Sequence, residues 1–106
     1  MKLPATLGLS AIIAAQSAAA GWTFTWRQPN GTPHVVTALE DKGCTVIDHG
    51  KGKEFDWTRS FESDCCIRLW TNPHCSGDMA GFSCPSWKKD ASVTLFSFEV
   101  TNCILP

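Results

Sequence analysis

Six cysteines in a short chain constrain what this sequence can fold into more than any other feature. They are Cys44, Cys65, Cys66, Cys75, Cys84 and Cys103. All six lie in residues 21–106, where they make up about 7% of the chain, a density typical of small secreted domains that disulfides stabilise. The even number predicts a framework of disulfides, and the sequence alone leaves the pairing open.

Two of the cysteines are adjacent, and this limits the pairing. Cys65 and Cys66 open an apolar, strand-like run, so their side chains leave opposite faces of the strand and must find different partners. A metal site is the alternative use of cysteine. The sequence has no Cys-x₂-Cys pair, and its three histidines are scattered, whereas zinc sites need closely spaced ligands. We therefore expect structural disulfides and no metal.

Residues 1–20 have the three parts of a secretory signal peptide. Lys2 supplies the positive charge, the apolar run follows over residues 7–15, and small residues at positions 18–20 suit cleavage before Gly21. A transmembrane anchor needs roughly 20 apolar residues, about twice what this run offers. We expect a secreted, extracellular protein with one cysteine-rich β domain over residues 21–106 and no membrane span.

Alternation of apolar and polar residues in short runs predicts an all-β fold. The expected strands cover residues 22–26, 35–37, 44–47, 65–71 and 93–100. Turn signals separate them at intervals of about ten residues, as in a small sandwich or barrel. The best helical candidate is a single turn over residues 86–91.

Five tryptophans and six phenylalanines, with no tyrosine, supply the bulk of a small core. The tryptophans are Trp22, Trp26, Trp57, Trp70 and Trp87. Strand alternation turns at least one of each close pair inward, so we expect packing in the core and at its rim. The alternative is a flat platform of two or three rings that stacks on sugars.

Charge argues against a polyanionic partner. Removal of Lys2 with the signal peptide lowers the basic count from 9 to 8 against 10 acidic residues, which leaves a net charge of −2. Nucleic acid and anionic membranes are therefore not expected as partners. The glycine-rich run over residues 50–53 lacks the P-loop pattern, and we expect it to be a mobile turn. No cofactor is expected.

A small secreted ribonuclease is the weakest of the functional alternatives. His34 and His49, with Glu54 and Arg59, are residue types that acid–base cleavage of RNA uses. Their spacing matches no catalytic motif, so we expect exposed loop histidines and no enzyme.

A glycosylation sequon runs from Asn30 through Gly31 to Thr32. Asn30 is therefore a possible site of N-linked glycosylation in a secreted chain. Pro33 directly after the sequon lowers the expected occupancy, and Asn-Gly is equally a tight-turn dipeptide.

The segment from Trp70 to Gly77 resembles the Greek-key signature of the β/γ-crystallin superfamily. Trp70 and Gly77 fill the aromatic and glycine positions, and Cys75 stands where a second aromatic is usual. The signature's later serine falls on Ser97. The resemblance implies a small disulfide-stapled Greek-key sandwich, with Gly77 at positive φ in a folded-over hairpin.

A weaker copy of the signature lies earlier in the chain. Phe24 and Gly31 are in register with it, Pro29 holds the middle position, and no serine partner is evident. The family's calcium motif would fall on residues 92–97, where both acidic positions and the first hydroxyl are missing. A calcium ion requires such oxygen ligands, so we expect no calcium there.

As a whole, the chain resembles small secreted cysteine-rich proteins of filamentous fungi. The leader and the segments over residues 51–57, 65–70 and 82–89 carry this likeness. Some proteins of that group act as effectors on a host. Together with the expected export, the disulfides and the lack of a catalytic set, this leads us to expect a monomeric, non-enzymatic, effector-like protein that acts outside the cell on an extracellular protein or glycan. The alternative is an antimicrobial or killer-type toxin with a crystallin-like fold.

Overall fold

The computed structural model describes residues 21–103. The expected signal peptide over residues 1–20 lies outside the described residues, as do residues 104–106. The described chain forms eight strands, and no helix occurs among residues 21–103. The strands are β1 (Trp22–Arg27), β2 (Pro33–Ala38), β3 (Lys42–His49), β4 (Glu54–Arg59), β5 (Cys66–Trp70), β6 (Met79–Ser83), β7 (Trp87–Asp90) and β8 (Leu95–Thr101).

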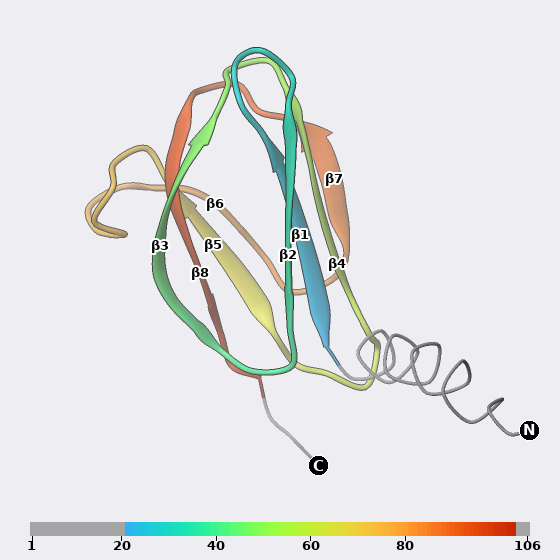
Figure 1. The fold of residues 1–106 in the computed structure, drawn as a ribbon. Helices are drawn as coiled ribbons and strands as arrows, with labels where there is room; N and C mark the ends of the chain where they lie inside the picture. The colour runs from blue at the N-terminus through green and yellow to red at the C-terminus, as the bar shows by residue number, and fades with distance from the viewer. Residues whose placement is uncertain (1–20, 104–106) are drawn as a thin grey trace, which may run out of the picture.

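The strands form two four-stranded sheets whose inner faces share one core (Figure 1). The first sheet has the order β2-β1-β4-β7 and the second has the order β3-β8-β5-β6. Every neighbouring pair is antiparallel. The expected all-β sandwich is confirmed.

Two successive units of four strands build the sandwich. In each unit the fourth strand returns to lie beside the first, β4 beside β1 and β8 beside β5, which is the Greek-key return. The third strand of each unit pairs in the other sheet, β3 with β8 and β7 with β4. Each sheet therefore contains strands from both halves of the chain.

Aromatic rings from both sheets meet in the core. Trp22 and Phe24 point inward from β1 because they alternate with threonines that face outward. Phe98 of the second sheet packs against both, with its ring centroid 4.8 Å from that of Phe24 and 6.3 Å from that of Trp22. Trp57 and Phe55 enter the same cluster from β4.

All three disulfides have partners far apart in the sequence. They join Cys44 to Cys75, Cys65 to Cys103 and Cys66 to Cys84. The adjacent pair Cys65 and Cys66 thus takes two different partners, which confirms the expectation from their opposite faces. Three disulfides in a small sandwich are consistent with an extracellular protein.

All five expected strands lie in observed ones, wholly or in large part, but three more strands were not expected. These are β4, β6 and β7. The expected helical turn over residues 86–91 is wrong, because this segment pairs with β4 as strand β7. Trp87 packs edge-on against Phe55 at 4.8 Å between ring centroids. This packing, together with the pairing to β4, overrides the weak local preference for a helical turn.

Candidate functional site

The loop between β5 and β6 contains most of the segment on which the signature falls. Ser97 on β8 is fully buried and ties this loop to the sheet. Its Oγ accepts a hydrogen bond from the Cys75 N–H at 3.2 Å and donates one to the Asn72 carbonyl oxygen at 2.5 Å. One hydroxyl therefore satisfies two backbone groups of the loop.

The remaining corner residues hold the same loop. Gly77 has φ +78°, as the signature predicts, and Cys75 has φ +51°. Trp70 is buried beneath the corner, at 5% exposure, directly across from Ser97. The disulfide from Cys75 to Cys44 links the loop to β3. At the position where the signature usually has an aromatic that packs on the corner, this chain therefore has a covalent bond.

The weaker copy of the corner uses different residues. Gly31 has φ +93°, and no serine ties the loop. Instead the Arg27 N–H donates to His49 Nδ1 at 2.9 Å, and the Gly50 N–H donates to the Arg27 carbonyl oxygen at 2.9 Å. Gly50 also lies so close to Pro29 that a Cβ would stand 2.7 Å from its Cα. The expected mobile turn over residues 50–53 is thus a tied and partly buried one.

His49 is a structural histidine. It is fully buried at the end of β3, and its second ring nitrogen, Nε2, lies 2.8 Å from the Lys53 carbonyl oxygen. Nδ1 accepts and Nε2 donates, so the neutral Nε2–H form fits the site. Burial lowers the pKa of His49 below 6.5, and the positive charge of Arg27 lowers it further, against a smaller upward effect of the hydrogen bond to Lys53.

The four residues of the ribonuclease alternative do not form a site. His34 lies in β2, where it stacks on Trp26 at 4.3 Å and bonds to Gln28 at 3.0 Å. Glu54 and Arg59 occupy opposite ends of β4. At about 3.3 Å per residue along a strand, their Cα atoms are about 16 Å apart. The expectation of loop histidines is wrong for His34 and His49, because both lie in strands.

Asn30 stands on an exposed turn, where a glycan would have room. Its Oδ1 accepts a hydrogen bond from the Thr32 N–H at 2.9 Å, an Asx-turn of the kind that Asn-Gly favours. Glycosylation of Asn30 stays a prediction.

The tryptophans pack as expected rather than forming a platform. Trp22, Trp57 and Trp70 are buried, and Trp26 and Trp87 are half-buried against the core. The phenylalanine with the greatest exposure is Phe61, at 91% in the loop after β4.

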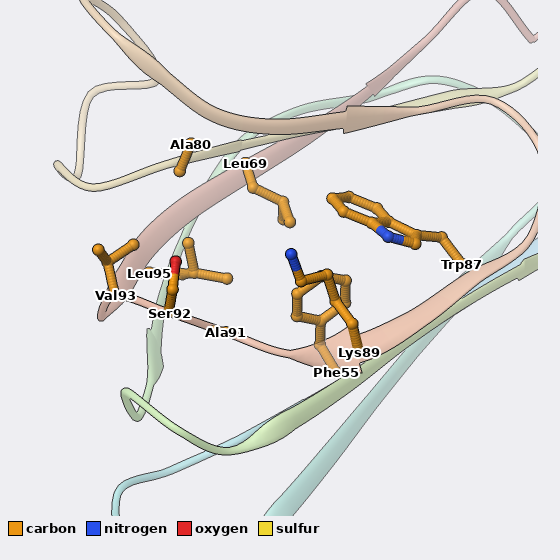
Figure 2. A pocket seen from close by; sticks show the side chains of 9 residues that line it. All are labelled: Phe55, Leu69, Ala80, Trp87, Lys89, Ala91, Ser92, Val93 and Leu95. Carbon is orange, nitrogen blue, oxygen red and sulfur yellow. The ribbon is translucent and has the colours of Figure 1, made fainter.

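A pocket opens on the side of the sandwich where the edge strands β7 and β6 face each other (Figure 2). We call it the edge pocket, and its volume is about 30 Å³, which is room for a water molecule. Its lining residues are Phe55, Leu69, Ala80, Trp87, Lys89, Ala91, Ser92, Val93 and Leu95. The lining is thus largely apolar, with one cationic side chain.

A second, wider pocket lies on the outer face of the second sheet. We call it the face pocket; it is open to solvent and its volume is about 360 Å³. It is lined by Cys66, Arg68, Phe82, Cys84, Thr101 and Asn102. Direct cross-strand pairing places Arg68 between Phe82 and Glu99. Its guanidinium lies 3.7 Å from the Glu99 carboxylate and 5.9 Å from the centre of the Phe82 ring.

Sequence reasoning missed both pockets, since their residues come from strands far apart in the chain. Among residues 21–103, no three His, Cys, Asp or Glu side chains gather closely enough to hold a metal ion. Nor does that part of the chain contain a helix long and apolar enough to cross a membrane. No protein-family model, curated protein or solved structure matches the chain.

Proposed function

We propose that this chain is a secreted, non-enzymatic protein that acts outside the producing cell by binding an extracellular protein or glycan, in the manner of an effector. The signal peptide expected over residues 1–20 and the three disulfides support export. The face pocket is the observation that carries the binding proposal.

The face pocket combines groups that recognise polar, ring-shaped partners. Phe82 is 51% exposed. Its cross-strand neighbour is Arg68, which forms the ion pair with Glu99. The Phe82 ring offers an apolar face to the C–H groups of a sugar or to an apolar side chain. Arg68 and Glu99 beside it can donate and accept hydrogen bonds, respectively. Exposed aromatics and arginines are also the residues that dominate protein interfaces.

The pocket is built on rigid elements. Strands β5, β6 and β8 pair side by side beneath it, and the disulfide between Cys66 and Cys84 crosses it. A preformed surface loses less conformational entropy when a partner binds. A rigid, cross-linked surface fits a protein that works by binding rather than by a moving catalytic loop.

The test is binding of the oxidised protein to a glycan array and to proteins of host extracellular fluid. F82A and R68Q are expected to lose the captured partner, because each removes one wall of the face pocket. V35A is the matched control, since Val35 is also exposed but belongs to the first sheet. Capture that survives both pocket variants, or catalytic turnover that one side-chain change abolishes, would contradict the proposal.

A crystallin-like killer or antimicrobial toxin is the second candidate. The two Greek-key units and the corner tied by Ser97 support this resemblance. A net charge of −2 gives little attraction to anionic membranes, so such a toxin would need a receptor or a cell-wall glycan. Dose-dependent dye uptake by a yeast, filamentous fungus or bacterium would favour the toxin. Silence across such a panel would favour the effector-like role.

A further inference from the structure

The face pocket presents its groups in two cross-strand rows on the outer face of the second sheet. Phe82 on β6, Arg68 on β5 and Glu99 on β8 form one row, because each is paired directly with the next. In the second row Cys66 pairs with Thr101. Neighbouring strands lie about 4.8 Å apart, so the first row spans about 10 Å and one ligand can contact all three side chains.

One wall of the pocket is an aromatic ring that the fold leaves half uncovered. Phe82 is 51% exposed, and the Arg68 guanidinium approaches its ring at 5.9 Å from the centre. The face of an aromatic ring carries partial negative charge, which attracts the slightly positive C–H groups along one side of a pyranose ring. The exposed ring therefore suits a ligand that is apolar on one face and polar at its edge.

The polar groups beside the ring are not fully used by the fold. Arg68 Nε is buried and has no hydrogen-bond partner within residues 21–103. The contact between Arg68 Nη1 and Glu99 Oε1, at 3.7 Å, is longer than a hydrogen bond. Thr101 and Asn102 add a hydroxyl and an amide to the lining. Because hydroxyl groups both donate and accept, a ligand rich in them can bond to the guanidinium and the carboxylate together.

The charges of the pocket cancel. Arg68 is the charged residue of the lining, and Glu99 lies against it as its ion-pair partner. An anionic ligand would meet the Glu99 carboxylate and a cationic ligand the Arg68 guanidinium, so an uncharged ligand fits best. The volume of about 360 Å³ is near the lower end of the range of small-molecule sites, about 300–1,000 Å³. A protein interface needs a wide patch with an apolar centre, whereas here one exposed ring borders polar groups and a disulfide.

We propose that the face pocket binds an uncharged oligosaccharide built of pyranose rings. One sugar ring stacks on Phe82, and its hydroxyl groups bond to Arg68 and Glu99. This inference rests on the proposed function and names the class of ligand that its site takes. Cell-wall glucans and the neutral glycans of glycoproteins share this chemistry.

The test is an NMR titration of the oxidised protein with cellohexaose, laminarihexaose and a neutral oligomannose N-glycan. The first two represent cell-wall glucans, and the third represents the glycans of glycoproteins. At least one of them is expected to shift the ring signals of Phe82 in a saturable way, whereas the acidic hexagalacturonate is not. Because the ligand is uncharged, raising the salt from about 50 to about 500 mM should change the affinity less than about twofold.

Variants separate ring stacking from simple apolar contact. F82L keeps an apolar side chain without the ring and should lower the affinity about tenfold or more, whereas F82W should retain binding. R68Q should weaken binding about fivefold or more, because it removes charged hydrogen-bond donors. F61L is the matched control, since Phe61 is 91% exposed in the loop after β4, outside the pocket.

Four results would overturn the inference: F82L binding as tightly as the wild type, equal losses in F61L and F82L, tighter binding of hexagalacturonate, or silence toward every oligosaccharide. If the oligosaccharides were silent but F82A abolished capture of an extracellular host protein, the proposed function would stand with a protein partner. If no partner of either kind bound, both the inference and the proposed function would fail.

Discussion

Replacement of Ser97 by alanine tests how the folded-over corner is held. The hydroxyl is fully buried and bonds to the Cys75 N–H and the Asn72 carbonyl oxygen. S97A removes both bonds and leaves two backbone groups of a packed loop without partners. Each lost bond with an unsatisfied group is worth about 1–2 kcal/mol, so we expect a loss of about 2–4 kcal/mol in the free energy of unfolding.

The disulfide between Cys44 and Cys75 shapes the result. It still ties the loop to β3 in S97A, so the native state should stay compact. Guanidinium unfolding of the oxidised protein should therefore show a lower midpoint with an unchanged m-value. S92A is the control, because Ser92 is exposed. A change in S97A within about 0.5 kcal/mol of the wild-type value would refute the reasoning, since that is the range of surface substitutions.

Three further predictions concern the rest of the fold. The pKa of His49 is lowered below 6.5 in the folded protein, so the unfolded chain binds the proton more readily and stability should fall as pH drops below about 6.5. A pH series of unfolding midpoints checks this, and the dependence of the midpoint on pH should flatten in H49Q. G50A should lower the free energy of unfolding by about 1–3 kcal/mol, because the added Cβ clashes with Pro29. G43A is the control, since a Cβ at Gly43 meets nothing, and an equally low unfolding midpoint in G43A would contradict the clash. Full reduction should lower the melting temperature steeply, since each disulfide is worth about 2–5 kcal/mol in a small domain; an unchanged melting curve in strong reductant would show otherwise.

Strands with strict alternation were predictable from sequence because one face enters the core. Residues 22–26 place Trp22 and Phe24 inward as the pattern requires. Strand β4 carries the same signal at Phe55 and Trp57, but charged neighbours hide it. Strands β6 and β7 carry little local preference for extended structure, with Gly81 in one and three charged residues in the other. They become strands because β5 and β4 offer edges to pair with.

The positive φ of Gly77 was predictable from sequence, and the pockets were not. The spacing of the signature predicts a positive φ at Gly77, and its φ is +78°. The cross-strand pairing of Trp70 with Ser97 and the hydrogen bond from Ser97 to Asn72 come from the assembled sheet. The edge pocket forms instead because β3 and β7 each pair in the sheet of the other half of the chain, which brings β7 opposite β6. Similarly, His49 followed by glycines and lysines has the composition of an exposed loop. It can be buried because the Arg27 N–H and the Lys53 carbonyl oxygen bond to its two ring nitrogens. These partners come together only in the assembled fold.

The central claim is that this chain is an exported, oxidised sandwich. The most direct test is mass spectrometry of the protein recovered from the medium of a secreting host, with peptide mapping under non-reducing conditions. The account predicts an N-terminus at Gly21 and the three pairs Cys44–Cys75, Cys65–Cys103 and Cys66–Cys84. Retention inside the cell with an intact N-terminus, free thiols, or another pairing would contradict it.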